Sequence, residues 1–167
     1  LMETPMIFIN RGENCVSING RLTFKQFMEK GFEGFYPTID DWRLHSNLYF
    51  PEVRLRNFIE IRNHDCVGGG LEYSIPALYK GIMYSKSAME EVEELLNKYT
   101  TSEIKELRYK VPRYAVNSKI CGKPILPVCK ELVEISYYSL KTQGEDEEKF
   151  LEPLMDLLKR GKCPADM

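Results

Sequence analysis

The sequence predicts an α+β fold in which a few antiparallel strands precede a mostly helical C-terminal half. Short alternating segments and one charged, β-branched segment lie within residues 1–66, whereas apolar residues recur at helical spacing over residues 71–161. The two kinds of segment do not alternate, which argues against a βαβ architecture. A chain of 167 residues can bury one core, so 1–66 is expected to be the strand-containing part and 71–161 the helical part of a single domain.

Composition and charge exclude several classes of protein. With 43% hydrophobic and 29% charged residues, the chain has the usage of a globular protein and not that of a disordered or collagen-like one. Its formal net charge of -2 provides no basic surface for nucleic acid or for an anionic membrane. No apolar run approaches the length that spans a bilayer. We therefore expect neither nucleic-acid nor membrane partners.

The cysteines and the two ends of the chain give further expectations. Five cysteines form an odd set without a C-x-x-C pair, which disfavours a zinc ribbon and a closed disulfide framework. Free thiols persist in reducing compartments, and we expect a cytoplasmic protein. Residues 5–9 enter a strand almost at once and residues 162–167 are turn-like, so a fragment of a longer protein is the alternative to a complete domain.

The first 50 residues predict a hairpin followed by two short helices. Met6–Asn10 and Cys15–Ile18 are apolar or alternating segments on either side of a turn-rich stretch. Apolar residues at helical spacing follow over 24–30 and again over 39–48. The residues expected to cap or end these helices are Thr23, Gly31, Thr38 together with Asp41, and Pro51.

The segment from Pro51 to Asp65 predicts one extended strand with two different faces. Successive side chains of a strand point to opposite sides, so one face is expected to pack against a core and the other is charged. The core face comprises Val53, Leu55, Asn57, Ile59 and Ile61, and the charged face comprises Arg54, Arg56, Phe58, Glu60 and Arg62.

Helical patterns dominate the rest of the chain. Pro76 lies inside the first of them and predicts a late helix start or a kink. Ser87 is expected to cap the second helix, and Gln143-Gly144 is expected to end the fourth. The expected helices cover residues 71–84, 88–99, 102–109, 124–141 and 145–160.

The charged face has the composition of an anion and metal site. Arg54, Glu60 and Arg62 are spaced so that they can converge on one ligand of several atoms. Arginine binds carboxylates and phosphates through two parallel hydrogen bonds, and Mg²⁺ prefers carboxylate oxygens together with substrate phosphates. The alternative is an amphipathic strand whose charges pair loosely in solvent and stabilise little. Both interpretations stay open at this point.

Three neighbouring segments resemble a known family. Asp41-Trp-Arg-Leu-His45 is followed by Leu48-Tyr-Phe-Pro-Glu-Val-Arg-Leu-Arg56 and Phe58-Ile-Glu-Ile-Arg-Asn-His-Asp65, and together they resemble glutamate–cysteine ligases of the plant and proteobacterial type. Similar segments lie upstream at Pro5–Ile9 and downstream at Ile75–Tyr84, Phe150–Leu154 and Pro164–Asp166, so that nearly the whole chain is covered.

The resemblance implies a catalytic region similar to that of glutamine synthetases and a reaction in two steps. ATP phosphorylates the side-chain carboxylate of glutamate, and the amine of cysteine then displaces phosphate to give γ-glutamylcysteine. It further implies that Glu60 ligates Mg²⁺, that Arg62 holds glutamate or the reacting phosphoryl group, and that Arg54 is a second anion contact. The implied cofactors are ATP and Mg²⁺, and the implied partner is an N-terminal part of the same protein.

The chain also departs from the family pattern. Glutamine synthetases have a further arginine two residues before the glutamate, where this chain has Phe58. The family is usually Gly-rich with Trp-Arg after the aspartate, whereas this chain has Cys66-Val-Gly-Gly-Gly70. That glycine run lacks the Lys and Ser/Thr of a P-loop. Family members are also much longer, and the resemblance implies that their remaining magnesium carboxylates and much of the nucleotide pocket lie before the segment that matches this chain. We therefore expect the chain by itself to be catalytically incomplete.

Two other classes of function stay open beside the ligase. One is a non-catalytic domain that keeps the fold and binds a ligand or partner through the charged face. The other is a related carboxylate–amine ligase with an amine other than cysteine. His45 is expected to pack within its helix, and His64 and Asp65 are expected to order a loop or cap a turn, in preference to metal binding.

Overall fold

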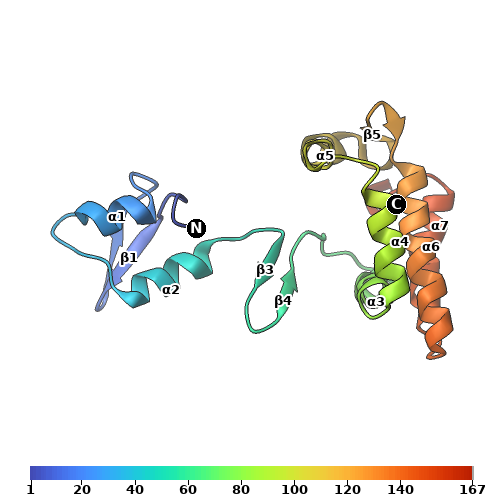
Figure 1. The fold of residues 1–167 in the computed structure, drawn as a ribbon, viewed down its shortest axis with the longest axis horizontal. Helices are drawn as coiled ribbons and strands as arrows, with labels where there is room; N and C mark the ends of the chain where they lie inside the picture. The colour runs from blue at the N-terminus through green and yellow to red at the C-terminus, as the bar shows by residue number, and fades with distance from the viewer. Residues whose placement is uncertain (167) are drawn as a thin grey trace. The chain divides into compact units, whose positions relative to one another are not determined.

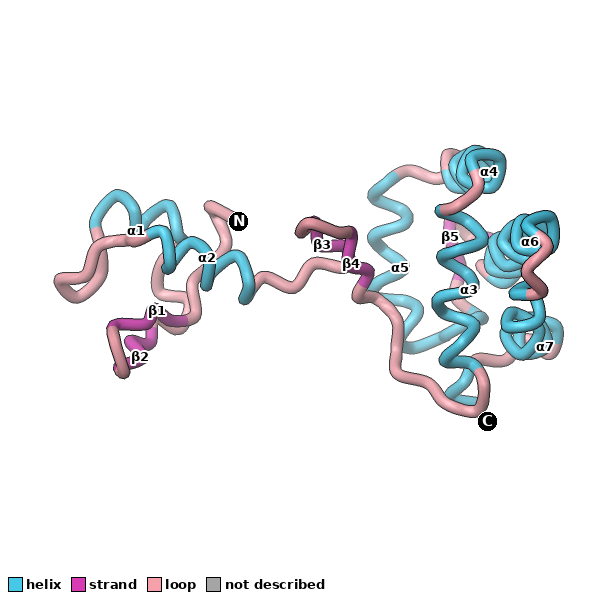
Figure 2. The backbone as a smooth tube through the Cα atoms, turned by 90° about the horizontal axis from the view of Figure 1, so that it is seen from below, coloured by secondary structure: helices cyan, strands magenta, loops and turns pink. Residues whose placement is uncertain are grey.

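The computed structural model describes residues 1–166 and divides into two compact units. Unit 1 comprises Leu1–His64 and unit 2 begins at Asp65. Figure 1 labels the α-helices and several strands of the two units, and Figure 2 shows that unit 1 combines strands and helices whereas unit 2 is mostly helical. The predicted α+β class is confirmed. No helix among residues 1–166 is both long and apolar enough to cross a membrane.

Unit 1 begins with the predicted hairpin and two helices. Strands β1 (Phe8–Arg11) and β2 (Asn14–Ser17) pair antiparallel, and helices α1 (Phe24–Lys30) and α2 (Ile39–Leu48) follow. The alternation of β1 and the helical spacing of α1 bring apolar side chains to one core, which removes them from water. That core consists of Met6, Ile9, Ile18, Leu22, Phe24 and Phe27.

The predicted caps of the two helices are confirmed. Thr23 and Thr38 each form a capping box, with Gln26 and Asp41 as the respective partners, and these side chains satisfy amides that the first helical turn leaves unpaired. Gly31 follows α1 with a φ of 68°, and a Cβ there would lie 2.7 Å from the Phe35 carbonyl oxygen. Only glycine fits both the backbone angle and this close approach.

The Asp41 carboxylate also anchors α2 to the first hairpin. Arg11 donates two hydrogen bonds to it, at 2.7 and 2.9 Å, and the Thr38 backbone amide donates another at 2.8 Å. Burial raises the pKa of Asp41, but the hydrogen bonds from Arg11 and Thr38 outweigh burial and hold that pKa below its ordinary value. The folded state therefore favours the ionised carboxylate.

Asp41→Asn should destabilise unit 1 at neutral pH by about 1 kcal/mol, because the bonds from Arg11 lose their charged acceptor. A lowered pKa in the folded state contributes stability above the ordinary pKa of aspartate, and this contribution disappears as pH falls through the folded value. The difference in unfolding free energy between the two proteins should therefore shrink as the pH falls below the ordinary pKa of aspartate. Urea unfolding monitored by the fluorescence of Trp42, the single tryptophan, measures the free energy of unfolding of unit 1 at each pH. A difference that stays constant from neutral to acid pH contradicts the assignment.

The predicted single strand over 51–65 is wrong, because the segment folds back on itself. Strands β3 (Val53–Leu55) and β4 (Ile59–Ile61) form an antiparallel hairpin around residues 56–58 (Figure 1). The expected core face is also wrong for most of its members, since Leu55 is 81% exposed and Ile59 is 58% exposed. Alternation showed which residues share a face, but it carried no information on what covers that face.

Unit 2 packs its helices around a separate core. The first helix, α3 (Leu71–Met83), lies against α6 (Leu126–Gln143), with α4 (Lys86–Leu96) and α7 (Glu152–Lys159) beside them. Helix α5 (Thr101–Tyr114) buries none of its residues. The remaining elements are the strands β5 (Lys119–Ile120) and β6 (Lys123–Pro124) and the 3₁₀ helices η1 (Ala115–Asn117), η2 (Glu147–Leu151) and η3 (Pro164–Asp166).

Several helix boundaries in unit 2 differ from the prediction. Helix α3 starts at Leu71 and runs through Pro76, so the late start is wrong. The cap of α4 is Ser85 and not Ser87. Helix α5 continues past Tyr109 and includes Pro112. The expected last helix is divided into η2 and α7. Propensity and pattern alone leave such boundaries open by a few residues.

Candidate functional site

The β3–β4 hairpin brings together the three residues that the sequence singled out. Arg54 and Glu60 are directly opposite each other in the ladder, and Arg62 follows β4 by one residue. In an antiparallel pair, opposite side chains lie on the same face at about 5 Å between Cβ atoms. Hairpin formation, and not spacing along one strand, therefore produces the predicted convergence. We call Arg54, Glu60 and Arg62 the hairpin cluster.

Both oxygens of the Glu60 carboxylate bind guanidinium groups. Arg54 donates from Nε at 2.8 Å, and its Nη2 lies 2.7 Å from the same Oε2 atom. Arg62 donates from Nη1 to the other oxygen, Oε1, at 2.7 Å. All three side chains are only partly exposed, so solvent screens these ion pairs incompletely.

These contacts hold Glu60 in its charged form. The hydrogen bond from Arg54 is the largest influence on its pKa, and together with the bond from Arg62 it outweighs desolvation and lowers the pKa of Glu60 below the ordinary value. Three arginines in this hairpin, counting Arg56, face one glutamate, so the hairpin keeps an excess of two positive charges. It can therefore attract a carboxylate or a phosphate.

The residues before β3 complete the surroundings of the hairpin cluster. The Asn47 carbonyl oxygen accepts from Arg54 Nη1 at 3.2 Å, and the Asn47 side chain accepts from Arg56 at 2.6 Å. The Phe50 ring lies beneath the guanidinium carbons of Arg54 and Arg62, at 5.8 and 4.8 Å from its centroid. Sequence reasoning missed Asn47 and Phe50, because only the hairpin turn places them beside the arginines.

Glu60 fits one position of a magnesium site and does not constitute one. Each carboxylate oxygen has two lone pairs, so the bonds from Arg54 and Arg62 leave room for a metal contact. The side chain is 27% exposed and can be reached. Over residues 1–166, however, no three His, Cys, Asp or Glu side chains group as metal ligands. Further ligands to a magnesium ion must come from substrate phosphates, water or other protein residues.

The other singled-out residues have structural roles. His45 is 4% exposed and stacks on Phe24 with the ring centroids 5.2 Å apart, which confirms that it packs in the core of unit 1. The glycine run caps α3: Gly70 occupies the N-cap position with a φ of 94°, and its amide donates to Glu72 Oε2 at 2.8 Å. That amide is therefore already bound to an anion from the protein itself.

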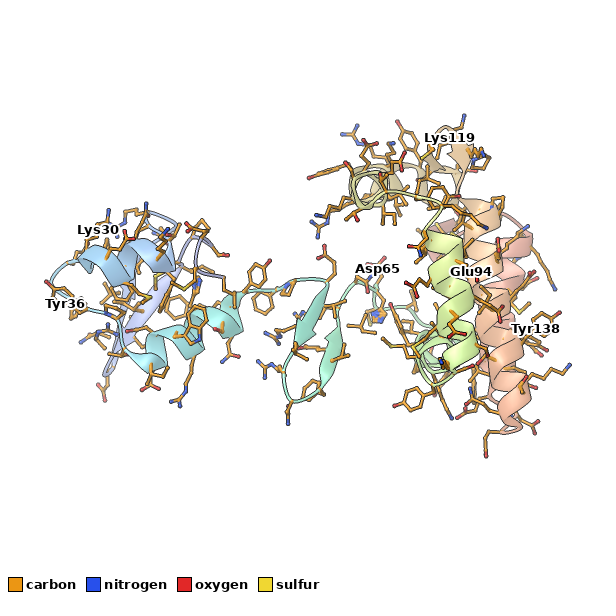
Figure 3. All side chains as sticks on the ribbon, in the orientation of Figure 1. Lys30, Tyr36, Asp65, Glu94, Lys119 and Tyr138 are labelled. Atoms are coloured by element: carbon orange, nitrogen blue, oxygen red, sulfur yellow. The ribbon has the colours of Figure 1, made fainter. Side chains whose placement is uncertain are left out.

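A separate cavity lies elsewhere, between α4 and α6 of unit 2. It has a volume of about 680 Å³ and is lined by polar and acidic side chains that include Glu94 and Tyr138, labelled in Figure 3. None of the hairpin cluster lines it, and its glutamates would repel an anionic substrate. The chemistry of the hairpin cluster is therefore the better guide to the site than the size of this cavity.

Comparisons with known proteins agree with the resemblance seen in the sequence. The model of the glutamate-cysteine ligase family 2 (GCS2) matches residues 1–167. A chloroplastic glutamate–cysteine ligase of Solanum lycopersicum is 30% identical over 99% of this chain, and one of Nicotiana tabacum is 28% identical over the same share. The matched region is 32% of each of those proteins, so the chain spans about a third of their length.

The expected cytoplasmic location is contradicted by these relatives, which are named chloroplastic enzymes and point to a plastid. Free cysteines are compatible with any reducing compartment, so their number does not distinguish one such compartment from another. Because the family model covers its whole length, the chain belongs to the glutamate-cysteine ligase family 2.

Proposed function

We propose that this chain contributes the hairpin cluster to the active site of an ATP- and magnesium-dependent glutamate–cysteine ligase. The product is γ-glutamylcysteine, formed through γ-glutamyl phosphate in the first step of glutathione synthesis. The observation that carries the proposal is the partly buried Glu60 carboxylate between Arg54 and Arg62, in a chain of this family. The rest of the site, with the other carboxylates for the metal and the nucleotide pocket, belongs to protein segments beyond these residues in a catalytic region like that of glutamine synthetases.

The proposed reaction has two balanced steps. An oxygen of the glutamate γ-carboxylate attacks the γ-phosphorus of ATP, and the bond to ADP breaks. The cysteine amine then attacks the acyl carbon, loses a proton, and expels phosphate that carries the former carboxylate oxygen. Negative charge moves onto the phosphoryl oxygens in the first step, which is where positive groups held in place lower the barrier.

The roles of this chain's residues follow from their charges. Arg62 binds the substrate carboxylate or the phosphoryl group, and Arg54 adds positive charge beside it. Glu60 keeps both guanidiniums in place and supplies one ligand to the metal. When bound, Mg²⁺ neutralises phosphate oxygens and draws electron density from the reacting phosphorus.

The amine specificity tests this function against its alternatives. The longest polypeptide that carries these residues should release ADP only when ATP, magnesium and glutamate are present, and cysteine should accelerate the release more than alanine, glycine or ammonia. Mass spectrometry should identify γ-glutamylcysteine. An equal response to all amines supports a related carboxylate–amine ligase instead, and glutamate binding without any ADP release supports a non-catalytic domain.

A further inference from the structure

Phe50 occupies an unusual place beside the hairpin cluster. The residue follows α2 and precedes β3, and it is 60% exposed instead of being buried in the core of unit 1. Guanidinium carbons of two arginines lie over the ring, Arg62 at 4.8 Å and Arg54 at 5.8 Å. Both distances are within the range of a cation–π contact. The exposed ring is therefore a platform for two cations.

The two arginines differ in how much of their hydrogen-bonding capacity the protein already uses. All three nitrogens of the Arg54 guanidinium contact an acceptor, since Nε and Nη2 lie against Glu60 and Nη1 donates to the Asn47 carbonyl. In the described part of the chain, Arg62 uses only Nη1, which binds Glu60. The edge of Arg62 formed by Nε and Nη2 keeps the geometry that binds a carboxylate or phosphate through two bonds.

We propose that Phe50 and Arg54 are positioning residues, and that they hold Arg62 as the anion-binding guanidinium of the cluster. Glu60 restrains one nitrogen of Arg62, and the Phe50 ring restrains the plane of the group. Arg54 binds the second oxygen of the Glu60 carboxylate and so holds the orientation of that carboxylate. The assignment of the bound anion to glutamate or a phosphoryl group rests on the proposed function, whereas the arrangement of the residues does not.

The benefit of such an arrangement is entropic. An arginine side chain loses much rotamer freedom when it becomes fixed, and a group fixed before the ligand arrives loses less on binding. Removal of the ring leaves Arg62 attached through one nitrogen to Glu60 and free to turn about that contact. Affinity for the anion should fall while the hairpin itself persists, because Phe50 is not part of the core of unit 1.

Three variants of the 167-residue chain test the proposal by nitrogen-15 NMR of the arginine Nε groups during titration with inorganic phosphate. Phe50→Leu should raise the dissociation constant for phosphate about fivefold, which is the size of effect that a cation–π contact supports. Phe50→Tyr keeps the aromatic face and should bind like the original chain. Phe58→Leu is the matched control, because Phe58 lies in the same hairpin and is 56% exposed. Within residues 1–166, the arginine guanidiniums of the hairpin cluster lie over the Phe50 ring and not over the Phe58 ring.

In the original chain, phosphate should shift the Arg62 Nε resonance and leave the Arg54 resonance nearly unchanged. The proposal is overturned if Phe50→Leu binds phosphate as well as the original, if Phe50→Tyr binds as poorly as Phe50→Leu, or if Arg54 shifts as much as Arg62. The proposal is also overturned if the unsubstituted chain does not bind phosphate.

Steady-state kinetics of the longest polypeptide provide a separate measure. Phe50→Leu should raise KM for glutamate about fivefold and change kcat by less than about twofold, because the ring orients a binding group and does not touch the reacting atoms. Absence of ligase activity in the original polypeptide would disprove the proposed function, and the phosphate titration would still decide the roles of Phe50 and Arg54.

Discussion

Glu60→Gln should lower glutamate-dependent ADP formation by at least about 100-fold, the size of loss that follows removal of one preorganised group that stabilises transition-state charge. The amide has almost the shape of the carboxylate, so the hairpin should persist. It lacks the negative charge, however, so it neither balances Arg54 and Arg62 nor ligates a magnesium ion well. Loss of one group thereby affects three contacts at once.

The measurement is initial ADP formation over a range of magnesium concentrations in the longest polypeptide that carries the substitution. Glu13→Gln, an exposed position in the turn between β1 and β2, is the control and should retain full activity. An activity of Glu60→Gln within about threefold of the original, at the same magnesium requirement, would remove Glu60 from the site.

Gly81→Ala should destabilise unit 2 by about 2 kcal/mol, because α3 and α6 approach each other at this residue. A Cβ at position 81 would lie 2.1 Å from Ser136 Oγ and 2.6 Å from the Ser136 carbonyl oxygen, so the helices must separate. Overpacking of this kind destabilises by about 3 kcal/mol, and the better helix propensity of alanine offsets about 1 kcal/mol. The bond from Ser136 to the Leu78 carbonyl, at 3.0 Å, would also be strained.

Hydrogen exchange of the α3 and α6 amides measures this loss, and it should become about 30-fold faster under conditions where exchange follows unfolding. Gly68→Ala is the control, because an added Cβ there meets nothing within 4 Å. Trp42 lies in unit 1, and its fluorescence reports the unfolding of that unit. Unit 1 should unfold at the same urea concentration in all three proteins. Unchanged exchange in Gly81→Ala would show that the helices can move apart at little energetic cost.

The sequence predicted local features of unit 1 well where one residue type decides them. The caps at Thr23 and Thr38 follow from side chains that accept hydrogen bonds from nearby amides, which needs no knowledge of distant residues. The hairpin of β3 and β4 was missed because residues 56–58 contain no glycine or proline to mark a turn. A hairpin and a single strand with this alternation place Arg54 and Glu60 on one face equally well.

The candidate site was predicted in part for the same reason. Glu60 and Arg62 are two residues apart and resemble a family motif, so their association depends on local sequence alone. The contributions of Asn47 and Phe50 depend on how the chain turns after α2, which periodicity does not describe. In unit 2, α5 continues through Pro112 although proline disfavours helix interiors, so propensity placed its end too early.

The transfer of oxygen from glutamate to phosphate tests the central claim most directly. Glutamate labelled with oxygen-18 in its γ-carboxylate is incubated with ATP, magnesium, cysteine and the longest polypeptide that carries this chain. If an acyl phosphate forms, the released phosphate should contain one labelled oxygen per γ-glutamylcysteine, and the Glu60→Gln variant should produce almost none. Product formation with unlabelled phosphate, or no product at all, would contradict the proposed ligase mechanism.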